Sequence, residues 1–159
     1  MEMAAVARTL LRLLGRIPIA LALLLAIASA PRHAPAQSVS YQVIVNAANP
    51  TTQLTREEVS RLFLRKVLSW KTGGAAEPVD QSPASPVRQS FTKAVHHKDV
   101  AQIRGYWQQI LFTGQGAPPI EKANDEEVIE LLAKIPGAIG YVSSAATLGS
   151  GVKAIRIVD

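Results

Sequence analysis

The chain has 159 residues, enough for one domain, and its formal net charge is +5. It contains no cysteine, which excludes disulfide staples and a lipid anchor on cysteine. The positive charge is concentrated at the N-terminus, because residues 37–159 contain thirteen basic and eleven acidic side chains, a net charge of +2. That balance, with no basic stripe between aromatic residues, gives no support to a nucleic-acid partner.

Residues 1–36 have the pattern of a secretory signal peptide. Three arginines precede a short apolar run, Ile17 to Ala28, and small residues follow it. A membrane span needs about 20 apolar residues, so this run is short for one. We therefore expect residues 37–159 to form one periplasmic domain with no stable membrane insertion after cleavage. An uncleaved N-terminal anchor is the alternative.

The predicted cleavage site lies between Ala30 and Ala36. The triplet Ala28-Ser29-Ala30 fits the small-residue rule, but Pro31 would then follow the cut. The triplet Ala34-Pro35-Ala36, which places Gln37 at the new N-terminus, avoids that problem.

The first elements of the exported part are a strand and a well-marked helix. Tyr41 to Asn46 is a short apolar run that predicts a strand buried on both faces. Thr55 and Glu58 form a capping box, which predicts a helix from that point. A short strand is expected at 77–81, followed by a helix that Ser85 caps and that has Pro86 at its first position.

The second half contains two more helices and two strands. Helical spacing of apolar residues begins near Asp99, and a third cap, Asn124, is followed by acidic residues that suit a helix N-terminus. Pro136-Gly137 ends that helix, and strands are expected at 138–142 and 152–158. Strands that alternate with helices predict an α/β fold with parallel strand pairs.

Four segments in this order resemble one known family. They are VIVNAANP (43–50), LTREEVSRLFLRKVLSW (54–70), PVDQSPASPVRQSF (78–91) and IPGAIGYVS (135–143). Together they are similar to the phosphate-type substrate-binding proteins of ABC transporters, which have the type 2 periplasmic-binding-protein fold. The resemblance implies a mostly parallel, mixed sheet with helices on both faces. It covers one of the family's two lobes, and the 159 residues contain no counterpart of the other.

The resemblance also implies a site at the start of the Ser85 helix. Ser85 matches the family's anion-binding serine, but Gln81 replaces the family arginine, and Pro83 replaces the family aspartate. Pro86 and Val87 replace a glycine and a threonine, which removes one backbone N–H and one hydroxyl donor. The amides of Val87 and Arg88 remain candidate anion contacts.

The guanidinium of Arg88 and the side chains of Gln81 and Asn46 complete the predicted ligand-binding set. Asn46 is included because ligands of open α/β sheets gather at the carboxyl ends of strands. A helix cap without a ligand would explain Ser85-Pro86 equally well.

We find no pattern for catalysis or for a metal site. His96 and His97 are adjacent, so on a helix they point in different directions and chelate poorly. Ser90, His96 and Asp99 lack the sequence context of a hydrolytic nucleophile. Trp70 and Tyr141 belong to family motifs and are expected in the core, or at a surface where a second lobe would sit.

The predicted function is non-catalytic binding of phosphate or another small anion, weakened by the replaced residues. The family resemblance implies an ABC permease or another envelope protein as the partner, and no cofactor. The alternative is an interaction module that kept the fold and lost the ligand. A homodimer that rebuilds a two-lobe clamp is a third possibility.

Overall fold

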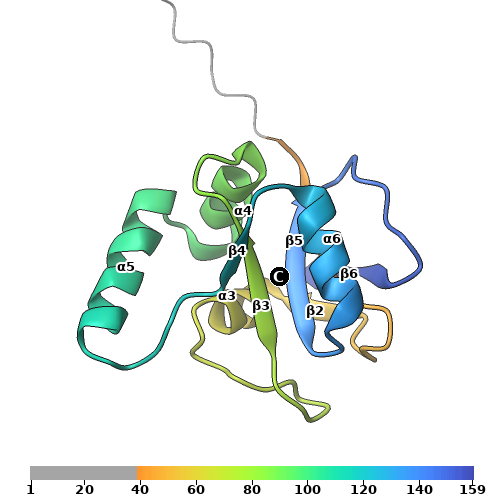
Figure 1. Cartoon of the computed structure of the whole chain (residues 1–159), viewed down its shortest axis with the longest axis horizontal. Coiled ribbons are helices and arrows are strands. Elements are labelled where there is room, and N and C mark those ends of the chain that lie inside the picture. Colours follow the sequence, from red (N-terminus) through yellow and green to blue (C-terminus); the bar gives the residue numbers. More distant parts are fainter. Residues whose placement is uncertain (1–38) are drawn as a thin grey trace, which may run out of the picture. The chain divides into compact units, whose positions relative to one another are not determined.

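The computed structural model of the chain describes residues 39–159, in which a six-stranded sheet is covered by helices (Figure 1). In chain order the elements are β1 (Tyr41–Asn46), β2 (Gln53–Thr55), α3 (Arg56–Phe63), β3 (Glu77–Gln81), α4 (Pro86–His96), α5 (Val100–Phe112), β4 (Ile120–Lys122), α6 (Asp125–Lys134), β5 (Ala138–Ser143) and β6 (Val152–Val158). None of these helices has the length and hydrophobicity needed to cross a membrane. The predicted signal peptide and its cleavage site lie outside the described residues.

The sheet is mixed, in the order β2-β6-β1-β5-β3-β4. Strand β1 at the centre runs antiparallel to both neighbours, β5 and β6, while the other three strand pairs are parallel. The predicted α/β fold with a mostly parallel, mixed sheet is therefore confirmed. The sequence did not predict the edge strands β2 and β4, because three residues are too few to show a periodic pattern.

The helices begin where the caps predict. Thr55 Oγ1 accepts the Glu58 amide at 3.1 Å, and Glu58 Oε2 accepts the Thr55 amide at 2.8 Å, so the capping box of α3 is complete. Asp99 caps α5 and Asn124 caps α6 through the same kind of contact, to the amide three residues on. These contacts satisfy N–H groups that have no partner inside the helix.

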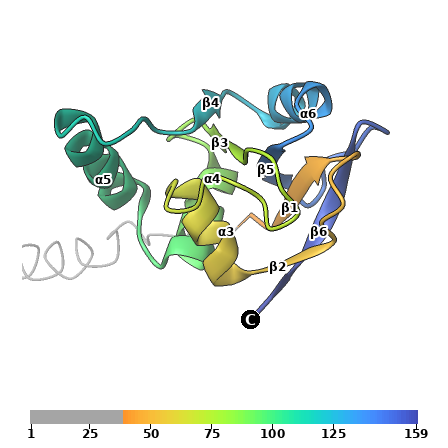
Figure 2. The same ribbon diagram turned by 90° about the horizontal axis from the view of Figure 1, so that it is seen from below.

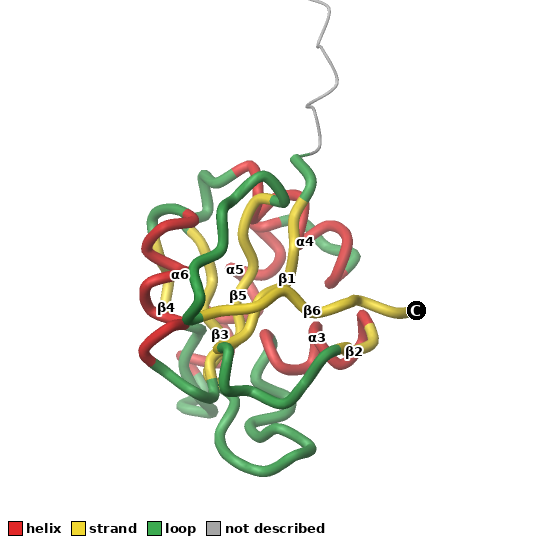
Figure 3. Tube along the Cα trace, turned by 90° about the vertical axis from the view of Figure 1, so that its right-hand side faces the viewer, coloured by secondary structure: helices red, strands yellow, loops and turns green. Residues whose placement is uncertain are grey.

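Helices cover both faces of the sheet (Figures 2 and 3). Successive residues of a strand point to opposite faces. Val43 and Val45 of β1 accordingly pack in the cluster on the α3 and α4 side, and Ile44 packs in the cluster under α6. Burial on both faces of β1 is thus confirmed.

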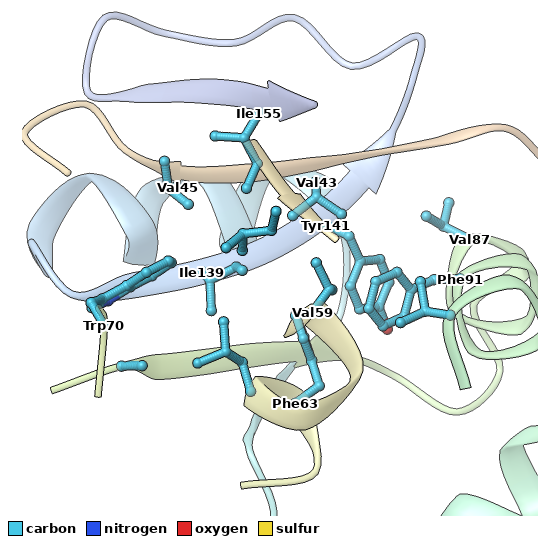
Figure 4. Close-up of a cluster of buried hydrophobic side chains, with 14 residues drawn as sticks. Val43, Val45, Val59, Phe63, Trp70, Val87, Phe91, Ile139, Tyr141 and Ile155 are labelled. Carbon is cyan, nitrogen blue, oxygen red and sulfur yellow. The ribbon is translucent and has the colours of Figure 1, made fainter. Parts of the chain in front are cut away.

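The larger cluster contains an aromatic stack (Figure 4). The rings of Phe91 on α4 and Tyr141 on β5 lie 3.8 Å apart with an interplanar angle of 9°. Trp70 lies at the other end of this cluster, and its indole N–H donates to Gly137 O at 2.9 Å. Trp70 and Tyr141 are therefore core residues, the first of the two roles expected from the sequence.

Candidate functional site

The predicted anion site lies where β3 ends and α4 begins. Ser85 caps α4 and accepts the Arg88 amide at 3.3 Å, with Pro86 in the first helical turn. Its hydroxyl donates in turn to Gln81 Oε1 at 2.7 Å. The structure therefore brings Gln81, Ser85 and Arg88 into contact with one another, and Ser85 already has partners within the chain.

Gln81 is buried, and its side chain joins four elements. Its Nε2 donates to Tyr141 O on β5 at 3.0 Å and to Asp125 Oδ1 on α6 at 2.7 Å. Asp125 Oδ2 also accepts the Ser143 amide at 3.1 Å. Both amide hydrogens of Gln81 and its oxygen are thus used in contacts that hold β3, α4, β5 and α6 together.

Arg88 is almost fully buried, with 3% of its surface exposed, and it is paired with two carboxylates. Its Nη2 lies 3.0 Å from Asp80 Oδ2, and its Nη1 lies 2.6 Å from Glu121 Oε1 on β4. Nη1 also donates to the carbonyl of Gln81. The Nε is buried with no hydrogen-bond partner among the described residues. The Arg88 side chain therefore points into the protein. A residue in the first turn of a helix could equally have pointed to solvent.

The buried carboxyl of Asp80 has a second partner, the hydroxyl of Tyr141, which donates to Oδ1. Burial raises the pKa of Asp80, while the charge of Arg88 and the Tyr141 hydrogen bond act against that rise. Burial and the adjacent Asp80 raise the pKa of Tyr141 well above its usual value, so this phenol stays protonated. The network thus contains three carboxylates (Asp80, Glu121 and Asp125) and one guanidinium.

Val87 and Asn46 are placed differently. The side chain of Val87 is buried in the α3–α4 cluster, so its amide is the part that an anion could contact. Asn46 Nδ2 donates to Leu132 O at 2.7 Å and Ala133 O at 3.2 Å, and Oδ1 accepts the Ala48 amide at 2.9 Å.

Asn46 and Gln81 lie at opposite ends of the sheet. β1 runs antiparallel to β5, and β5 runs parallel to β3, so the carboxyl ends of β1 and β3 face in opposite directions. The offset between the two residues corresponds to about four strand positions, roughly 13 Å. The structure therefore does not bring Asn46 together with the other predicted site residues.

Sequence reasoning missed Asp80, Glu121 and Asp125 as members of this site. A signal was present for Asp80, because an acid between buried residues of a strand needs a partner. No comparable signal marked Glu121, which lies in a strand that the sequence did not predict. In residues 39–159, no group of three or more His, Asp or Glu side chains is arranged to hold a metal ion.

No protein-family model and no curated protein matches this sequence. Solved structures do match. An ABC-type phosphate transport receptor from Vibrio cholerae superposes with a TM-score of 0.60 and 22% identity, over 75% of this chain and 46% of that one. A phosphate ABC transporter substrate-binding protein from Clostridium perfringens with bound phosphate gives a TM-score of 0.61 and 19% identity, over 75% and 45%.

PstS from Borrelia burgdorferi gives a TM-score of 0.59 and 15% identity, over 75% of this chain and 47% of that one. The chain thus spans less than half the length of the structures it matches, and identities this low establish the fold alone. The resemblance predicted from the sequence is confirmed at that level: this chain has the α/β fold of one part of the phosphate ABC transporter substrate-binding proteins.

Proposed function

We propose that this protein is a non-catalytic, exported domain of the substrate-binding-protein type that acts by binding another envelope protein and does not capture free phosphate. One observation carries the proposal: the groups expected to hold an anion are already bonded to groups of the chain itself. Gln81 is bonded to Asp125 and Ser85, and Arg88 is bonded to Asp80 and Glu121.

Electrostatics supports the same conclusion. An anion that approaches the α4 N-terminus meets three carboxylates and only one guanidinium, which disfavours a further negative charge. The helix terminus offers fewer amides than usual, because Pro86 has no N–H and the Arg88 amide donates to Ser85. Replacing the Arg88 contacts with contacts to phosphate would leave the buried carboxyl of Asp80 without its charged partner, which is costly.

Weakened anion binding is the second candidate. It is favoured by the likeness to phosphate receptors and by the position of Arg88, whose Nε has no partner among the described residues. The side chain of Glu121 is 47% exposed, so it is free to rotate away and release the guanidinium to an anion. In this case an ABC permease would be the expected partner.

A thermal-shift titration of the protein, expressed from its full 159-residue chain, separates the two candidates. Phosphate, sulfate and molybdate are compared with chloride at matched ionic strength. A ligand at 100 times its Kd would stabilise the fold by about 2.7 kcal/mol, a rise in Tm on the order of 10 °C. We expect no saturable shift with any of the anions.

The Glu121→Gln variant shows whether the carboxylate of Glu121 is what prevents anion binding at Arg88. Glu126→Gln is the matched control, because Glu126 is an exposed acid outside the network. A shift that appears only in Glu121→Gln supports the proposal. A saturable shift in the unaltered protein that Ser85→Ala reduces would overturn the proposal in favour of anion binding.

A further inference from the structure

Helix α5 has an outer face that nothing in the described domain covers. The helix lies to one side of the sheet, beyond α4, on which it packs (Figures 1 and 2). Its inward residues, Ile103 and Trp107, are buried. The opposite side is an exposed stripe, which we call the outer stripe, formed by Ala101, Gly105, Gln108 and Phe112. Their spacing of four, three and four residues places all of them on one side of a helix.

The composition of this stripe is unusual for a solvated helix face. Phe112 is 94% exposed, and the neighbouring Leu111 is 53% exposed. No charged residue occurs from Gly105 to Ile120, a run of sixteen residues that are mostly exposed. Protein interfaces are depleted in charge and enriched in aromatic residues at their centres. The outer stripe likewise has no charge and carries one exposed aromatic side chain, Phe112.

Gly105 is a second unusual feature. Glycine within a helix is about 1 kcal/mol less favourable than alanine. A Cβ at this position would have no atom within 4 Å, so no contact within the domain requires glycine here. The gap it leaves on the outer stripe is space that another chain can enter.

We propose that the outer stripe of α5 binds the same stripe of a second copy of this protein, with the two helices antiparallel. In a two-fold arrangement about the middle of the stripe, Phe112 faces the partner's Ala101, and Gln108 faces the partner's Gly105. Each large side chain then meets a small one, as close helix packing requires. The stripe is complementary to itself, which is the condition for a two-fold dimer.

Charge favours a second copy over an unrelated charged partner. A two-fold interface brings each surface against itself, so a stripe with charges of one sign would repel its partner. The outer stripe has no charge, and burial of the exposed Phe112 side chain would contribute the largest hydrophobic stabilisation of its four residues. None of its residues belongs to the network around Gln81 and Arg88, so this inference does not depend on the proposed function.

Sedimentation equilibrium of the protein, expressed from the 159-residue chain, tests the dimer at concentrations between about 1 and 500 µM. We expect a reversible monomer–dimer equilibrium. Phe112→Asp should weaken it at least tenfold, because the charge would be buried against an apolar partner. Gly105→Leu should do the same by filling the gap, while it raises helix propensity and leaves the monomer folded. Leu68→Asp is the control, since Leu68 is 60% exposed but lies outside α5.

Cysteine cross-linking tests the antiparallel register, because the chain has no cysteine of its own. A mixture of the Ala101→Cys and Phe112→Cys variants should form a disulfide-linked dimer on oxidation. Ala101→Cys alone should not, because its two thiols would lie about 16 Å apart along the helix axis. A dimer with no cross-link in the mixture would overturn the register.

A monomer at every concentration, or a dimer insensitive to both Phe112→Asp and Gly105→Leu, would overturn the inference as a whole. The thermal-shift titration with phosphate, carried out on the same protein, keeps the two proposals separate. A monomer with no phosphate response contradicts the dimer only, and a dimer with a saturable phosphate response contradicts the proposed function only.

Discussion

Arg88 is a buried side chain whose charged partners, Asp80 and Glu121, belong to the same domain. With Arg88→Met, the buried carboxyl of Asp80 loses its charged partner. Breaking a buried pair from one side costs about 3–5 kcal/mol, and we expect a loss of that size in the free energy of unfolding measured with urea. Glu121→Gln should cost less than about 1 kcal/mol, because the Glu121 side chain is half exposed. Equal losses in the two variants would contradict a buried Arg88–Asp80 pair.

His96 predicts a pH dependence of stability. Burial lowers the pKa of His96 from 6.5 to about 4, and the charges of Arg88, His97 and Lys66 act in the same direction. The Ser60 hydroxyl and His96 Nδ1 are 2.8 Å apart, within hydrogen-bond distance. The unfolded chain binds the proton more tightly than the folded chain. Stability is therefore complete above pH 6.5 and is lost as the pH falls from 6.5 to about 4.

The loss attributable to His96 is up to about 3 kcal/mol, since one pKa unit corresponds to about 1.4 kcal/mol. Denaturation with urea at pH 7.5, 6, 5 and 4 measures it, and His96→Asn should remove most of the decrease. His97→Asn is the matched control, because His97 is exposed. Burial raises the pKa of Asp80, so its contribution to stability increases as the pH falls, opposite to that of His96. This contribution is the same in every variant and cancels in the comparison. Parallel pH profiles for the unaltered protein and His96→Asn would refute this assignment.

At the scale of elements, the turn that precedes β5 joins separate parts of the fold. Gly137 O accepts hydrogen bonds from the Trp70 indole at 2.9 Å and from the Glu77 amide at 3.0 Å. A Cβ on Gly137 would lie 2.2 Å from Ala75 O, a backbone atom that cannot rotate away. Glycine is therefore required by a close approach of two backbones.

We expect Gly137→Ala to lower the free energy of unfolding by about 1–3 kcal/mol or more, as overpacking does. Gly105→Ala is a matched substitution in open space within α5, and it should raise stability by up to about 1 kcal/mol. Thermal unfolding of both variants in dilute solution measures the contrast. A Gly137→Ala protein as stable as the unaltered one would show that the two backbones can separate without cost.

At the scale of the whole molecule, the two proposals concern different parts of the domain. The α4 N-terminus is the position at which the sequence resemblance led us to expect an anion, and there the contacts of Arg88 and Gln81 are internal. The outer stripe of α5 is exposed and uncharged, and it lies outside that network. The phosphate titration and the sedimentation experiment therefore report on different parts of the protein.

The sequence by itself determined most of the elements and the fold class. The caps Thr55, Ser85 and Asn124 start helices where they were expected to, because a cap depends on an amide only three residues away. Asp99, near which helical spacing was expected to begin, is also a cap. The motifs from residue 43 to residue 143 were sufficient to indicate the phosphate-receptor fold. The short strands β2 and β4 escaped prediction, since each exists only through pairing with a distant strand.

The tertiary structure alone decided how the polar groups of the site are used. Arg88 meets Glu121, 33 residues away, and Gln81 meets Asp125 and the Tyr141 carbonyl, 44 and 60 residues away. Strand pairing over long range also separates Asn46 from the site, because β1 and β3 run in opposite directions in the sheet. Local patterns determine where an element begins and which of its faces is apolar. Which buried donor meets which acceptor depends on the register of strands that are distant in sequence, and no local pattern contains that information.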